Sequence, residues 1–132
     1  MKDSLRPGLT RTASYQTTLD MRARQLTADV FSTPSMISLM ERTCTELTEP
    51  FLDNDEQTVG IHIDVRHLAS TRIGQSVTMN AEIIELKGRK IRYSVVAYND
   101  TGLKIGEGTQ WRAVIDIRQF ATEIDGEVDH VH

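Results

Sequence analysis

The sequence has little of several features that mark particular classes of protein. One cysteine in 132 residues, Cys44, excludes an intramolecular disulfide framework. No apolar run reaches the roughly 18 residues of a membrane-spanning helix. The formal net charge of -4 argues against binding of nucleic acid or anionic membranes, because both require a positive field. No basic and apolar leader pattern begins the chain, so we expect a cytoplasmic protein.

The residues that are present suffice for one folded unit. With 132 residues, 39% of them hydrophobic, the chain can bury one core. We expect a single domain over residues 1–120 and an acidic, mobile tail, "ATEIDGEVDHVH", over 121–132. Two histidines on a mobile tail make no metal cage, so we expect no functional metal.

The stretch "FSTPSMISLMERTC" has the features of a helix start. Thr33 followed by Pro34 predicts a cap and a first helical position, and the helix should run from about Pro34 to Leu47 or Thr48. At about 100° per residue, Glu41 falls about 40° from Ile37, inside or beside the apolar face. The pattern therefore places a carboxylate at or near the buried side of the helix.

After this helix the sequence alternates with a period of two, which is typical of half-buried strands. Turn residues at 88–89 and 99–102 separate the later segments. The predicted strands are 13–19, 58–70, 76–88, 90–100 and 103–120, and residues 21–32 form a short helix or a loop. Together they predict an α+β fold in which one helix covers one face of a largely antiparallel sheet. An exposed edge of that sheet would pair with a second copy of the chain.

Three polar residues are expected on the helix side of the sheet. His67 shares the parity of Ile63 and Val65, so its imidazole should point toward the helix that carries Thr33 and Glu41. A hydroxyl, an imidazole and a carboxylate are the group types of a nucleophile, a base and an orienting residue. Each also has a purely structural interpretation, as a helix cap, a solvated edge carboxylate and a strand-end histidine respectively.

Four segments resemble a known family: "FSTPSMISLMERTC", "VGIHIDVRHLAST", "GQSVTMNAEI" and "GEGTQWRAVI". They are similar to the fluoroacetyl-CoA thioesterase family of hot-dog-fold thioesterases over roughly residues 31–117. The resemblance implies a hot-dog fold, an antiparallel sheet wrapped around one long central helix. It implies catalytic roles for Thr33, Glu41 and His67, with Gly60 beside the thioester and Arg112 near the acyl-CoA. Without the resemblance, Gly60 would be interpreted as a bulge or close-packing glycine, and Arg112 as a solvated strand residue.

The resemblance also carries expectations about assembly and substrate. It implies a homodimer, possibly paired further into a dimer of dimers, with active sites at the interface and no cofactor beyond the CoA of the substrate. Pro34 replaces a glycine of the nearest relatives, and the segment before Phe31 lacks their aromatic, proline-containing lid. We therefore expect hydrolysis of some small acyl-CoA other than fluoroacetyl-CoA. His67 would deprotonate Thr33 or a water, or Glu41 would attack the thioester itself.

Two other functions fit the same fold. The first is a non-catalytic acyl-CoA-binding protein in which Pro34 has cost the chain its turnover. The second is a hydratase or dehydratase, for which the sequence offers no suitably placed Asp and His pair.

Overall fold

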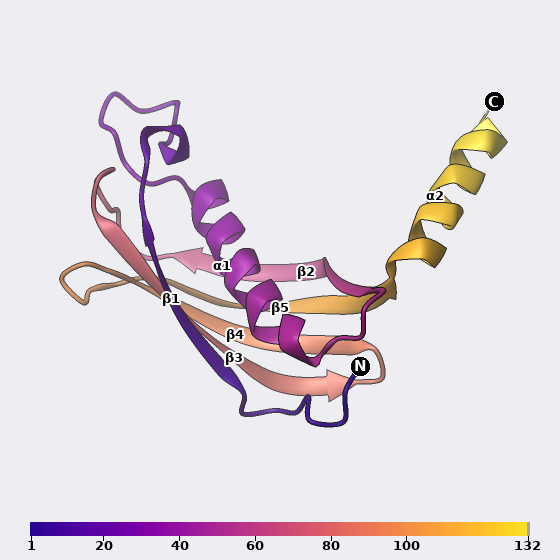
Figure 1. The fold of residues 1–132 in the computed structure, drawn as a ribbon. Coiled ribbons are helices and arrows are strands. Elements are labelled where there is room, and N and C mark those ends of the chain that lie inside the picture. The colour runs from indigo at the N-terminus through magenta and orange to yellow at the C-terminus, as the bar shows by residue number, and fades with distance from the viewer. Residues whose placement is uncertain (132) are drawn as a thin grey trace.

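The fold is a five-stranded antiparallel sheet curled around one long helix, as Figure 1 shows. The computed structural model describes the backbone of residues 1–131 and the side chains of residues 1–126. The strands are β1 (Thr10–Gln16), β2 (Glu56–His67), β3 (Ser76–Lys87), β4 (Lys90–Asn99) and β5 (Lys104–Asp116). The helices are α1 (Thr33–Thr48) and α2 (Ile117–Val131), with short 3-10 turns at Leu19–Met21 and Glu49–Phe51. The predicted α+β class is confirmed.

Helix α1 begins one residue earlier than predicted. The side chain of Ser32 accepts a hydrogen bond from the backbone N–H of Ser35 at 3.1 Å, so Ser32 is the N-cap. The prediction that Thr33 caps the helix is wrong, because Thr33 already has helical geometry and Pro34 follows within the first turn. This one-residue shift leaves the Thr33 hydroxyl available for another partner.

The core lies between α1 and the concave face of the sheet. Met36, Met40 and Cys44 of α1 are fully or almost fully buried against strand residues such as Ile83 and Tyr93. Met36 packs so tightly on β5 that a Cβ atom added to Gly106 would lie 2.5 Å from its sulfur. The sequence suggested a bulge or bend at this glycine, and the structure shows that it makes room for the helix.

Strand β2 lies at the edge of the sheet, whose order is β1-β3-β4-β5-β2. Its register against β5 shifts between Gly60 and His62, so that Ile61 is a bulge. Before the bulge Gly60 pairs with the buried Arg112, and after it Ile63 pairs with the buried Gln110. An unbroken period of two along this strand would place Val59 and Ile61 on the helix side together with Ile63. That prediction is wrong for the residues before the bulge. His67 follows the bulge, and its predicted helix-side position is correct.

The ends of several elements differ from the prediction. Strand β1 starts and ends earlier than 13–19, and residues 22–32 form an irregular loop after the 3-10 turn. Strand β5 ends at Asp116 instead of continuing to Phe120, because the Asp116 carboxylate caps a new helix by accepting from the N–H of Gln119 at 3.0 Å. The acidic tail predicted from residue 121 on belongs to helix α2 up to Val131, and its mobility stays a prediction. No helix in the described part of the chain is long and apolar enough to cross a membrane.

Candidate functional site

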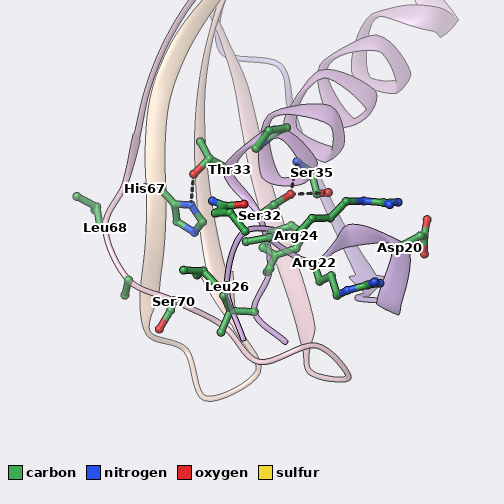
Figure 2. Close-up of a pocket in the computed structure, with 16 residues that line it drawn as sticks. Asp20, Arg22, Arg24, Leu26, Ser32, Thr33, Ser35, His67, Leu68 and Ser70 are labelled. Atoms are coloured by element: carbon green, nitrogen blue, oxygen red, sulfur yellow. Dashed lines mark hydrogen bonds between the residues drawn. The ribbon is translucent and has the colours of Figure 1, made fainter. Parts of the chain in front are cut away.

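A hydroxyl and an imidazole meet where α1 begins and β2 ends. Thr33 Oγ1 lies 2.7 Å from Nδ1 of His67, the last residue of β2 (Figure 2). Because Ser32 caps the helix, the Thr33 hydroxyl is not needed as the cap, and the strand parity after the Ile61 bulge turns His67 toward the helix. The structure therefore brings together two of the three predicted catalytic residues.

The surroundings of His67 favour its neutral form. Burial lowers the pKa of the imidazole below its ordinary value of 6.5, and the ring edge of Phe31 packs against it with centroids 6.5 Å apart. Its second nitrogen, Nε2, is buried and has no hydrogen-bond partner in the described part of the chain. A neutral imidazole near pH 7 can accept a proton, and a buried polar atom without a partner marks a place where a ligand group could bind.

A cavity of about 790 Å³ opens beside this pair. Its walls are the loop 22–32, the first turn of α1 and the residues that follow His67. Figure 2 shows Leu26 beneath the imidazole and the guanidinium groups of Arg22 and Arg24 on the far side, toward Asp20. Because the N-terminus of α1 lines the cavity, the helix dipole favours negative charge that develops there.

The other three predicted site residues form a separate cluster. Arg112 Nη1 donates to Glu41 Oε2 at 3.0 Å, and the arginine also binds the hydroxyl and the carbonyl of Thr58 and the side chain of Gln110. A Cβ atom on Gly60 would lie 2.9 Å from the same Glu41 oxygen. Gly60 is thus the residue whose missing side chain makes room for the carboxylate.

Glu41 does not face the His67 of its own chain. Thr33 and Glu41 are eight positions apart on α1, which is about 12 Å along the axis at 1.5 Å per residue. The three polar residues expected on the helix side of the sheet therefore do not all meet within one chain, because a helix displaces residues along its axis even when they share a face. The Glu41 side chain is 36% exposed and that of Arg112 is 7% exposed, so the carboxylate is the accessible end of this ion pair.

Burial of Arg112 overturns its interpretation as a solvated strand residue. Its place on β5, alternating with Gln110 and Val114, puts it on the buried face of the sheet, where four hydrogen bonds satisfy it. Sequence reasoning missed the supporting residues Thr58 and Gln110. Polar residues at alternating positions of an otherwise apolar face were the signal that could have found them.

The remaining candidates carry no chemistry in this site. Burial raises the pKa of the Cys44 thiol to about 12, which leaves it protonated and unreactive. Among the described residues no group of three metal-ligating side chains occurs. The side chains of the terminal "DHVH" segment lie outside the described residues.

Solved structures with the same architecture define the class of fold. A thioesterase superfamily member from Thermus thermophilus superposes with a TM-score of 0.88, covering 97% of this chain and 96% of its own at 23% identity. A hot-dog-like protein from Thermanaerovibrio acidaminovorans gives 0.84, with 92% and 91% covered at 19% identity. The chain therefore has the predicted hot-dog fold.

Comparison at the sequence level gives the family. The profile of the family described as fluoroacetyl-CoA-specific thioesterase, FlK, matches residues 14–118, so the chain belongs to this family of thioester hydrolases. The fluoroacetyl-CoA thioesterase of Streptantibioticus cattleyicolor is 36% identical over 96 residues, which are 73% of this chain and 68% of that protein. A solved structure of FlK is 30% identical with a TM-score of 0.88, covering 94% of this chain and 98% of its own. A variant of FlK has been solved with acetyl-CoA.

Proposed function

We propose that this protein hydrolyses a small acyl-CoA thioester to the free acid and CoA. The observation that carries the proposal is the Thr33 and His67 pair, 2.7 Å apart at the wall of a cavity of about 790 Å³. Family membership and the acetyl-CoA complex of the FlK variant support an acyl-CoA as the substrate. No aromatic residue occurs between Asp20 and Val30, so the cavity has no aromatic lid there to select a fluorinated acyl group.

In this mechanism His67 is the general base. Its lowered pKa keeps the ring neutral, and it takes the proton of the attacking oxygen, either the Thr33 hydroxyl or a water. Negative charge then develops on the thioester oxygen near the N-terminus of α1, whose dipole stabilises it. The protonated imidazole returns the proton to the departing thiolate. A burst of CoA release in rapid mixing that Thr33→Ala abolishes would indicate attack by Thr33 and an acyl-enzyme that water then hydrolyses, whereas direct attack by water gives no burst.

The complete site is composite in this proposal, formed by two copies of the chain that pair through β2. Exposed Ile61 and Ile63 on this edge strand support such pairing, since an unpaired edge with apolar side chains is a template for a second chain. The accessible carboxylate of Glu41, a residue of α1, lies above Gly60, which belongs to this edge strand. His67 of the same chain is too far away for Glu41 to contact it. Glu41 of the partner subunit would then orient the protonated His67 or the attacking water.

The test is the release of free thiol from short-chain, branched and aryl acyl-CoAs. The wild type should release CoA from at least one of them, and His67→Ala should lose this activity by about 10²-fold or more. His62→Ala is the matched control, because His62 points to the opposite face of the same strand and is exposed. Thermal stabilisation by acyl-CoA without any turnover would overturn the enzyme and favour the non-catalytic binding protein.

A further inference from the structure

Helix α2 presents an apolar stripe that the described part of its own chain leaves largely exposed. Ile117, Phe120 and Ile124, spaced three and four residues apart, are 48%, 39% and 43% exposed. Every residue from 117 to 125 is exposed, and Figure 1 shows the helix projecting away from the sheet. A 15-residue helix with Gly126 in its interior is marginal in water by itself. Its stability therefore requires a surface against which the stripe can pack.

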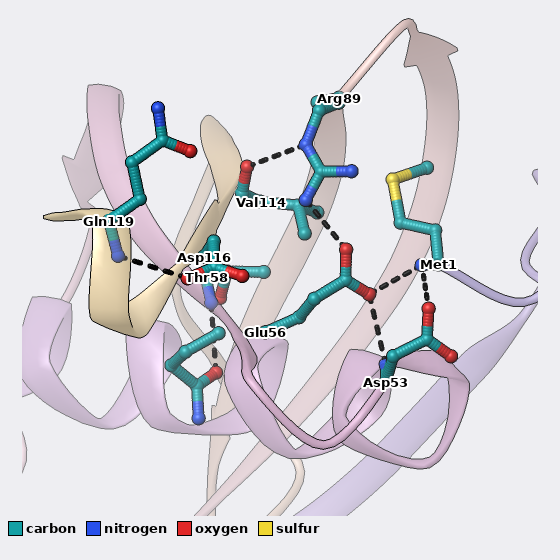
Figure 3. A network of polar contacts seen from close by, with 9 residues as sticks. Met1, Asp53, Glu56, Thr58, Arg89, Val114, Asp116 and Gln119 are labelled. Carbon is teal, nitrogen blue, oxygen red and sulfur yellow. Dashed lines mark hydrogen bonds and ion pairs between the residues drawn. The ribbon is translucent and has the colours of Figure 1, made fainter.

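The base of α2 is fixed to the beginning of the edge strand. The N–H of Ile117 donates to the carbonyl of Asp55 at 2.7 Å, and Arg118 lies 3.5 Å from the Asp55 carboxylate. Figure 3 shows the same corner, where Glu56 accepts from the amino group of Met1 and from Arg89. These contacts hold the first turn of α2 beside Glu56, the first residue of β2.

Pairing of two β2 strands determines what lies opposite this corner. Two identical edge strands related by a two-fold axis run antiparallel, so the beginning of one β2 lies beside the end of the other. The composite site places Gly60, beneath Glu41, beside His67 of the partner subunit, so Glu56, four residues earlier, would lie beside the residues that follow that histidine. Asp116 pairs with Glu56 inside its own chain, which puts the start of α2 about two strand spacings, ~10 Å, from those residues. The first turn of α2 thus reaches the mouth of the partner's cavity.

The rim of that cavity matches the stripe in chemistry. Leu26 and Leu68, which line the cavity, are both exposed and offer apolar surface next to His67. Arg24 also lines the cavity, with its guanidinium toward Asp20. On α2, Glu123 and Asp125 are exposed acidic residues close to Ile124. The apolar stripe and its acidic neighbours would therefore face an apolar rim that has a basic residue, Arg24, nearby.

We propose that α2 of each copy covers the acyl cavity of the other copy, with its apolar stripe on the rim formed by Leu26 and Leu68 of the partner subunit. Each active site then has a wall supplied by its neighbour, and the acyl group is enclosed only in the dimer. The inference rests on the dimer of the proposed function, but it does not require turnover.

Cross-linking between two differently marked chains tests the contact without any substrate. One chain carries Leu26→Cys, the other carries Ile124→Cys, and a short bismaleimide is added to the mixed dimers. The only native thiol, Cys44, is buried and protonated, so it contributes little background. We expect a covalent species of two chains that contains one chain of each kind.

Thr122→Cys in place of Ile124→Cys is the matched control, because Thr122 is on the same helix but off the apolar stripe. Cross-linking from Ile124 well above that from Thr122 is the expected result. Equal yields from both positions, no cross-link in a dimeric sample, or a monomer by sedimentation would each overturn the proposal. Because none of these readouts involves hydrolysis, an inactive protein that still cross-links would contradict only the enzymatic role.

Kinetics add a second readout in an active enzyme. Phe120→Asp places a charge in the stripe and should raise KM for acyl-CoA about tenfold while the dimer persists through β2. Thr122→Asp adds the same charge off the stripe and should leave KM within about twofold of wild type. Equal effects of the two substitutions would contradict a role of the stripe at the cavity.

Discussion

The two polar clusters on helix α1 differ in how completely their groups are satisfied. In the middle of the helix, Arg112 makes four hydrogen bonds and holds Glu41 in an ion pair. At its N-terminus, His67 has one hydrogen bond, to Thr33, and a buried ring nitrogen without a partner. Buried polar groups are normally paired, so the unsatisfied nitrogen points to a ligand, whereas the satisfied arginine points to a positioning role. This difference supports the proposed division, in which the N-terminal pair transfers the proton and the Glu41 cluster orients it.

Removing the Thr33 hydroxyl should have the largest effect on activity. Thr33→Ala is expected to lower kcat by about 10²-fold, because His67 loses the group that it contacts directly. Thr33→Ser should retain most of the activity. The melting temperature should change little, because Ser32 and not Thr33 caps the helix. A Thr33→Ala enzyme of full activity, measured by thiol release, would remove Thr33 from the mechanism.

Removing the arginine should instead lower stability. Arg112→Met deletes the donor for Glu41 and leaves Thr58 and Gln110 without their partner. We expect the free energy of unfolding in urea to fall by about 2 kcal/mol, less than for a fully buried pair because water reaches Glu41. Lys104→Met, which removes an exposed ion pair with Glu107, is the control and should lower the free energy of unfolding far less. Equal losses in both variants would show that burial adds nothing to the Arg112 cluster.

The pH dependence of kcat/KM should report the N-terminal pair alone. Burial lowers the pKa of His67 below 6.5, so the neutral base persists to lower pH than for a free imidazole. Activity should stay constant above pH 6.5 and fall by up to about tenfold per pH unit below the lowered pKa. The free energy of unfolding should also fall toward acidic pH, because the folded protein favours the neutral ring. This stabilising contribution of His67 is lost as the pH falls from 6.5 through the lowered pKa of the folded state. An acidic limb centred above pH 6.5 would contradict the assignment of His67 as the base.

The smallest expected effect on activity comes from removing the helix cap at Ser32, next to Thr33. Ser32→Ala removes the acceptor for the N–H of Ser35 and should cost about 1 kcal/mol of unfolding free energy. Its kcat should remain within about twofold of wild type if Thr33 keeps its place. Thermal denaturation and thiol release on the same sample should thus show lower stability with nearly unchanged activity, whereas Thr33→Ala should show lower activity with nearly unchanged stability.

Periodicity predicted much of this fold from sequence. The helix from about 34 to 48 and three of the five strands have nearly the predicted bounds, because a period of 3.6 changes to one of 2 after Pro50. The bulge at Ile61 could not be predicted, since it depends on pairing with β5 and not on local composition. Helix α2 was missed although Asp116 and Gln119 form a capping signature three residues apart. The apolar residues that follow it were interpreted as the end of a strand and a polar tail.

The site was predicted as one group of residues, and the structure divides it into two. Strand parity placed His67 correctly, and the helical wheel placed Glu41 near the buried face. A wheel projects a helix onto a plane, however, and so hides the ~12 Å between Thr33 and Glu41. The buried pairing of Glu41 with Arg112 depends on contacts between distant segments, which no local pattern encodes.

Mixing two inactive chains tests most directly whether the two clusters meet between copies. His67→Ala and Glu41→Gln chains are purified separately, refolded together and assayed for thiol release against each parent. After random pairing, half of the dimers contain one chain of each kind. If each site takes His67 from one copy and Glu41 from the other, every such dimer has one intact site out of two. Activity should therefore recover to about a quarter of wild type. Recovery no higher than the parents, in a sample shown to contain mixed dimers, would contradict the composite site and return Glu41 to a structural role.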